Sequence, residues 1–238
     1  MTKNIKIAVG LIYLLCLSLI IYGFFIFIDV TQLNNYSYIR DKTQFLIEIR
    51  DQDFAWFATL FFLFIMLWVL LLGFATPIAL VSGFLFGKIY GTLISVFGFT
   101  IGCTILYIFA NQYFKDLILK KLSKRISRFK EIINKNEFFY FMIFRFAGGG
   151  GTPFAIQNLL PVLFNMKIKN YFFSTLIGLF PMVFILNAIG SGIENIIENN
   201  VNPSFLTMIQ NKEIYFPILG FLIILIISFT LRKIYFKK

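Results

Sequence analysis

The residue with the clearest chemical potential is Arg145, the only charged residue in the apolar stretch 138–166. On membrane-insertion scales, an arginine at the centre of such a segment costs about 2.5–3.5 kcal/mol, so it needs water, a partner or a polar ligand. No Asp or Glu lies inside the long apolar stretches to pair with it. We therefore expect an external counter-ion such as a lipid phosphate, which a guanidinium binds through two parallel hydrogen bonds. The structural alternative is an interfacial arginine that snorkels to water.

A turn with possible anion-binding groups follows Arg145. Its four consecutive glycines are Gly148, Gly149, Gly150 and Gly151. Next come Thr152 and Pro153, residue types preferred at the N-cap and first position of a helix. Free N–H groups at such a turn attract anions, so Arg145, the glycines and Thr152 could converge on one phosphate; a plain hairpin turn is the compatible alternative. Gln157 and Asn158 lie on the returning arm, where they could bind a headgroup or hydrogen-bond between helices.

The residue types absent from the sequence argue against catalysis. The chain has no histidine, which removes HExxH zinc sites, Ser-His triads and imidazole proton relays. Cys16 and Cys103 each stand alone in an apolar stretch, so neither a disulfide framework nor a metal pair is expected. With no acidic residue in these stretches either, we expect no catalytic residue, no metal, no cofactor and no enzyme activity.

The composition indicates a membrane protein. Hydrophobic residues make up 59% of the 238 residues and charged ones 14%, whereas soluble domains are about a quarter charged. The 33 phenylalanines cannot all be buried in one water-soluble core of this size. We relate the net charge of +11 to anionic lipid and to topology, and expect no nucleic-acid partner, because the aromatic residues lie in apolar stretches.

Uncharged stretches and their breaks define the elements that must position these residues. Residues 1–53 are expected to hold a transmembrane anchor over 7–28 and a polar outer loop, and 194–238 an outer loop and a transmembrane helix over 214–231. The central region, 54–193, is divided into a hairpin over 54–88, a helix over 89–114, a basic amphipathic segment over 115–137, a hairpin over 138–166 and a helix over 171–193.

An internal repeat connects the two hairpins. The sequence Thr-Pro-Ile-Ala-Leu at 76–80 matches Thr-Pro-Phe-Ala-Ile at 152–156, 76 residues later. Small residues in apolar helices allow close packing, and proline interrupts or kinks them. The residues assigned to hairpin turns and packing are Thr76, Pro77, Gly83, Gly87, Gly91 and Pro181.

The distribution of charge predicts the topology. If both hairpins return to their side of entry, the pieces 1–6, 115–137, 167–170 and 232–238 share the cytoplasmic side and carry 16 of the 22 basic residues. The outer pieces, 29–53 and 194–213, carry four basic and eight of the eleven acidic residues. The sequence therefore predicts an all-α integral membrane fold: an inverted repeat with two opposed re-entrant helical hairpins plus spanning helices.

An ordered set of residues resembles the DedA/VTT-domain superfamily, and within it the SNARE-associated, TVP-type branch. The set comprises Gly83-Phe84-Leu85-Phe86-Gly87, Gly91, Gly98, Gly102, Tyr107, Arg145, Pro153-Phe154, Gln157-Asn158, Phe172, Phe173, Gly178 and Pro181. The resemblance implies opposed re-entrant hairpins and a role in moving phospholipids or polyprenyl phosphates. This chain departs from the DedA branch proper, whose first hairpin carries acidic residues, so proton coupling through a buried carboxylate is not expected.

Two functions follow from these residues and from the family resemblance. The first is a lipid translocator, of scramblase or flippase type, with a phosphate-binding site at the bilayer midplane and membrane lipids as partners. The second is a carrier of a small polar solute or ion through the same site. We expect a plasma (bacterial inner) membrane protein with cytoplasmic termini, and a homo-oligomer is compatible with the sequence.

Overall fold

The computed structural model is all-helical. It describes residues 29–32, 35–122, 133, 136–147, 152–199 and 211–236, together with positions 11, 15, 18, 19, 22, 23 and 26. These residues contain no strand, which confirms the predicted all-α class. The chain divides into two compact units, Met1–Asp53 and Phe54–Lys238.

The first unit contains a helix where the sequence predicted an outer loop. After a short 3-10 helix, η1 (Val30–Gln32), the helix α2 covers Tyr36–Gln52. The side chain of Asn35 caps it, because its Oδ1 accepts a hydrogen bond from the Ser37 N–H at 3.1 Å. No proline or glycine interrupts these residues, so this part of the predicted outer loop is helical. The anchor predicted over 7–28 lies almost entirely outside the described residues.

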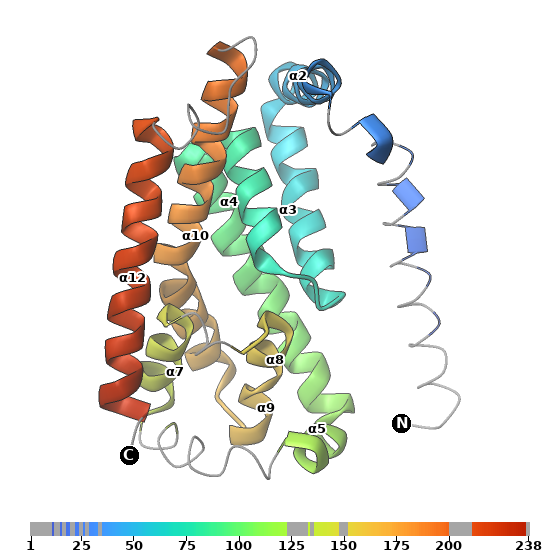
Figure 1. The fold of residues 1–238 in the computed structure, drawn as a ribbon. Coiled ribbons are helices and arrows are strands. Elements are labelled where there is room, and N and C mark those ends of the chain that lie inside the picture. The colour runs from blue at the N-terminus through green and yellow to red at the C-terminus, as the bar shows by residue number, and fades with distance from the viewer. Residues whose placement is uncertain are drawn as a thin grey trace. The chain divides into compact units, whose positions relative to one another are not determined.

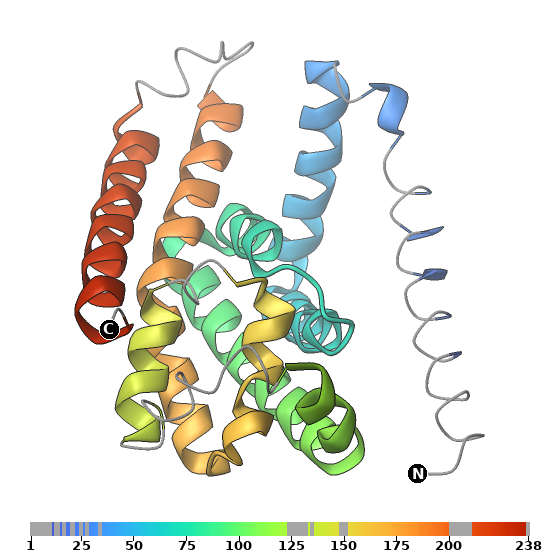
Figure 2. The ribbon, with the colours of Figure 1, turned by 60° about the horizontal axis from the view of Figure 1, so that its bottom comes forward.

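The second unit is a helical bundle (Figure 1). Its helices are α3 (Phe54–Leu70), α4 (Ala75–Tyr113), α5 (Lys115–Leu122), α7 (Glu137–Phe146), α8 (Phe154–Leu159), α9 (Pro161–Phe164), α10 (Ile168–Asn199) and α12 (Lys212–Phe236). Within the described residues, Ala75–Tyr113 and Ile168–Glu194 are long and apolar enough to cross a membrane. In both orientations α10 lies alongside α12 (Figures 1 and 2).

The turn between α3 and α4 comes earlier than the sequence suggested. Leu72 has a positive φ of 59°, and the indole Nε1 of Trp68 donates to the Phe74 carbonyl at 2.8 Å. The chain therefore reverses over 71–74, before Thr76 and Pro77, and not at these two residues. Pro77 lies in the first turn of α4, where its missing N–H removes no helical hydrogen bond.

Gly87 divides α4 into two limbs. Its φ of 72° and ψ of 174° are not helical, and a glycine adopts them without strain. The first limb runs back along α3, because the ring of Phe86 lies 5.8 Å from that of Phe54, the first residue of α3. The second limb then follows α3, with Gly98 against Ile65. The predicted division near residue 88 therefore coincides with a real break.

Helices α7, α8, α9 and α10 repeat this three-limb course. Glu137, at the start of α7, accepts a hydrogen bond from Asn170 Nδ2 at 2.6 Å, so α7 and α10 begin side by side. Between them, α8 and α9 return toward that end, and Asn165, with a φ of 54°, closes α9. Gly178, farther along α10, packs against Met142 of α7, so α10 runs alongside α7 in the same direction.

The two long helices touch through small residues. A Cβ on Gly83 of α4 would overlap the backbone of Asn187 on α10, and one on Gly190 would overlap the Leu80 carbonyl. The helices run antiparallel, because Gly91 also lies against Asn187, whereas the ring centroid of Tyr107 lies 4.9 Å from that of Tyr171, near the start of α10. Pro181 lies inside α10 without ending it. Because glycine has no side chain, the backbones of α4 and α10 can come into direct contact at these positions.

The basic segment 115–137 is only partly described. Its first residues form α5, whose Lys115 Nζ donates to Asn165 Oδ1 at 3.1 Å. Ile118 and Ile133, two apolar residues of this amphipathic segment, are buried in the protein core. The apolar residues of the segment therefore pack at least partly against protein.

Candidate functional site

Arg145 lies in the interior of the second unit, one residue before the end of α7. Its side chain is 1% exposed. The snorkelling alternative is therefore wrong for this structure, because the guanidinium points into the bundle and not toward its surface. The guanidinium is a cation, so the site carries a positive charge.

Three neutral oxygen atoms solvate the guanidinium. Nη2 donates to Asn158 Oδ1 at 2.6 Å and to the Tyr171 hydroxyl at 2.9 Å. Nη1 donates to Gln157 Oε1 at 3.4 Å, a longer and weaker contact. Asn158 Oδ1 also accepts from the thiol of Cys103, with an Sγ–O distance of 3.2 Å. Side chains of α4, α7, α8 and α10 thus meet at one point.

Aromatic rings enclose the charge. The Arg145 Cζ lies 5.2 Å from the ring centroid of Phe141, 5.6 Å from that of Phe154 and 5.8 Å from that of Tyr171. Cations are attracted to such ring faces, and the attraction increases when water is excluded. None of the described carboxylates pairs with Arg145, so dipoles and rings compensate its charge without neutralising it.

The hydrogen-bonding capacity of the site is incompletely used. A guanidinium has five N–H donors, and the three hydrogen bonds described above leave two of them, including the one on Nε. The buried Nδ2 of Asn158 also has no hydrogen-bond partner among the described residues. Unsatisfied buried donors beside an uncompensated cation suit an anion with several oxygens. In the described part of the chain, no group of three or more His, Cys, Asp and Glu could hold a metal ion.

The predicted site residues are brought together only in part. Arg145, Gln157 and Asn158 are in contact, and Gln157 Nε2 donates to the Thr152 carbonyl at 2.8 Å. The four glycines 148–151 lie outside the described residues. The predicted capping was wrong: Pro153 occupies the N-cap position and α8 begins at Phe154, because the ψ of Pro153, 142°, is extended. Thr152 therefore precedes the cap.

Three participants were missed from the sequence: Tyr171, Cys103 and Phe141. Tyr171 follows Arg145 by 26 residues in what looked like an ordinary span, and it meets Arg145 only because α7 and α10 begin together. Cys103 looked inert in its apolar helix, yet its thiol contacts Asn158. The signal available in the sequence was that Tyr171 and Cys103 are polar side chains in two predicted apolar helices.

Comparison with known proteins places the site within a recognised domain. The family model described as the VTT domain matches residues 73–192, half of the chain. The match begins at the turn before α4 and ends within α10, so it includes Arg145 and every side chain that contacts it. No solved structure matches the chain. Membership of the TVP-type branch stays a prediction. The chain belongs to the VTT domain family, the DedA/SNARE-associated group of membrane proteins.

Proposed function

We propose that this protein moves phosphate-bearing lipids across the membrane, with Arg145 as the midway binding site for the headgroup. The observation that carries the proposal is a buried guanidinium that has no carboxylate partner and two unused N–H donors among the described residues. Phosphate oxygens would complete its hydrogen bonds and neutralise its charge. The lipid tail would remain in the bilayer.

The course of the helices supports an inverted repeat. Gly102 packs against Met66 and Val69, and Gly178 packs against Met142 and Arg145. Adding 76 to the residue numbers of Gly102, Met66 and Val69 gives Gly178, Met142 and Arg145. The same spacing separates the two Thr-Pro sequences. Because α10 runs antiparallel to the second limb of α4, the two halves have opposite directions. Transporters built from such repeats hold their substrates near the midplane.

The two halves of the repeat differ in polarity. Moving back by the same spacing, Arg145, Asn158 and Tyr171 correspond to Val69, Ser82 and Ser95. These counterparts are buried but carry no charge. The asymmetry supports a single anion site on the second hairpin.

The proposed topology places the hairpins in opposite leaflets. The hairpin of α3 and the first limb of α4 would enter from the outer side, and the hairpin of α7, α8 and α9 from the cytoplasmic side, with both termini cytoplasmic. Two re-entrant tips would thin the apolar barrier between the leaflets. Because no Asp or Glu lies in the long apolar stretches to act as a coupling group, transport would run down the lipid gradient, with no enzymatic step. The expected location is the plasma (bacterial inner) membrane, as a monomer or homo-oligomer.

The alternative is a carrier of a small soluble anion, because the unused donors of Arg145 would also fit a free phosphate. Flux measurements in vesicles that contain the purified full chain separate the two functions. We expect a headgroup-labelled anionic phospholipid to cross in an accelerated, protein-dependent way, while encapsulated inorganic phosphate is retained. Protein-free vesicles give the background rate. Phosphate efflux without lipid movement would establish the alternative.

A further inference from the structure

A cavity lies apart from Arg145. It is a pocket of about 500 Å³ lined by α10, α12 and Lys88, the residue that follows the break at Gly87. Its volume falls within the roughly 300–1,000 Å³ typical of small-molecule sites. From this pocket we infer a separate binding site for a membrane lipid with an anionic headgroup. The inference concerns a different site from the proposed translocation path and does not depend on it.

The charged part of the pocket is formed by Lys88 and Lys212. The two lysines come from different elements, the second limb of α4 and the first residue of α12. Neither has an ion-pair partner among the described residues, and no carboxylate belongs to the described lining of the pocket. Two unpaired cations facing one cavity favour an anion, and an ammonium group binds phosphate as a point charge.

The remainder of the pocket is mostly apolar. The lining includes Phe184 and Ile185 of α10 and Phe216 and Pro217 of α12, with Ser191 as a polar addition. A free inorganic anion would leave this surface in contact with water. An amphiphile would cover it with hydrocarbon and place its headgroup between the lysines, so the lining favours a lipid over a soluble anion.

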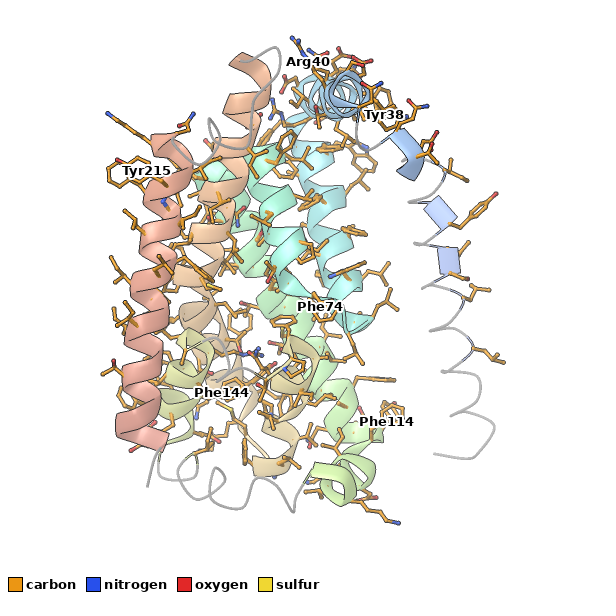
Figure 3. All side chains as sticks on the ribbon, in the orientation of Figure 1. Tyr38, Arg40, Phe74, Phe114, Phe144 and Tyr215 are labelled. Atoms are coloured by element: carbon orange, nitrogen blue, oxygen red, sulfur yellow. The ribbon has the colours of Figure 1, made fainter. Side chains whose placement is uncertain are left out.

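The pocket and Arg145 lie at different levels of the second unit. In Figure 3, Tyr215 of α12 lies near one end of the helix, whereas Phe144, the neighbour of Arg145, lies well toward the other. Phe54, where α3 begins, contacts Tyr90, two residues after Lys88. The pocket therefore lies at the end of the unit where α3 and α12 begin.

Photo-crosslinking with paired lipid probes tests the inference. The full chain is placed in phosphatidylcholine vesicles that also contain a photoactivatable probe lipid. The probe is either phosphatidylglycerol or phosphatidylcholine, and both probes carry the same photoactivatable acyl chain. We expect phosphatidylglycerol to label the peptides 184–192 and 216–220 about three- to tenfold more than phosphatidylcholine, the range for one or two weak ion pairs. Equal labelling by the two lipids would overturn the inference, whatever any variant does.

Matched variants assign the labelling to the pocket. Lys88→Gln with Lys212→Gln should reduce labelling to the phosphatidylcholine level, whereas Lys120→Gln with Lys169→Gln, the same charge change at exposed positions, should not. Gly220→Leu should reduce labelling, because the leucine side chain would fill the pocket. The position accepts a side chain, since a Cβ at Gly220 would meet Ile185 at an ordinary van der Waals distance of 3.5 Å.

Further controls distinguish this site from the translocation path and from a soluble-anion site. Arg145→Gln should leave the labelling unchanged, so a failure of the proposed function would not affect this result. Unaltered labelling in both the lysine and the Gly220 variants, or full competition by soluble glycerol phosphate, would contradict a lipid site here.

Discussion

Arg145→Gln should slow lipid translocation at least about tenfold, which corresponds to roughly 1.4 kcal/mol or more of lost headgroup stabilisation. Glutamine can still donate one hydrogen bond toward Asn158, but it removes the charge and the second donor for a phosphate. Arg145→Lys should keep part of the activity, because lysine retains the charge without the bidentate geometry. The rate of labelled-lipid movement in vesicles is the measurement.

The same substitution should leave the fold nearly as stable as before. A buried cation without a counter-ion is costly, so neutralising it offsets the hydrogen bonds lost to Tyr171 and Gln157. Arg40→Gln, the same chemical change in α2, is the control and should alter neither property. A large fall in melting temperature with undiminished transport per folded molecule would show that Arg145 serves the structure alone.

Gly190→Ala should destabilise the protein by about 1–3 kcal/mol, the range for overpacked cores. The added methyl group would overlap the Leu80 carbonyl and the Phe84 N–H, so the backbones of α4 and α10 would have to separate. Its melting temperature in detergent should fall by about 2–4 °C for each kcal/mol.

Gly220→Ala provides a control of opposite sign. At Gly220 the new methyl group makes ordinary van der Waals contact with Ile185, so only the higher helix propensity of alanine acts. We expect an unchanged or slightly higher melting temperature. Equal effects of the two substitutions would mean that the α4–α10 contact does not hold the helices together.

The sequence predicted the parts of the fold that depend on local chemistry. Arg145 stood out because a charge is rare in an apolar segment, and Gln157 and Asn158 followed as polar groups on the same hairpin. The division of α4 near residue 88 could be predicted because Gly87 allows a backbone conformation that other residues rarely adopt. Each of these inferences needed only neighbours in sequence.

Features that depend on tertiary contact could not be predicted in this way. Tyr171 binds Arg145 because two helix starts are joined through Glu137, a contact across 33 residues. The turn over 71–74 depends on the indole of Trp68, whereas Pro77 gave a stronger but misplaced local signal. The helix α2 was missed because its polar composition resembled a loop, although its cap residue Asn35 was visible.

The central claim is that the two hairpins enter the membrane from opposite faces, and accessibility labelling tests it most directly. Lys212 or Lys120 is replaced by cysteine in a chain that also carries Cys16→Ser. Cys103 is kept because it is buried. A membrane-impermeant maleimide added to intact cells should label position 212 and spare position 120 until the cells are opened. Labelling of both positions from the outside would contradict the opposed hairpins and, with them, the proposed path for the lipid.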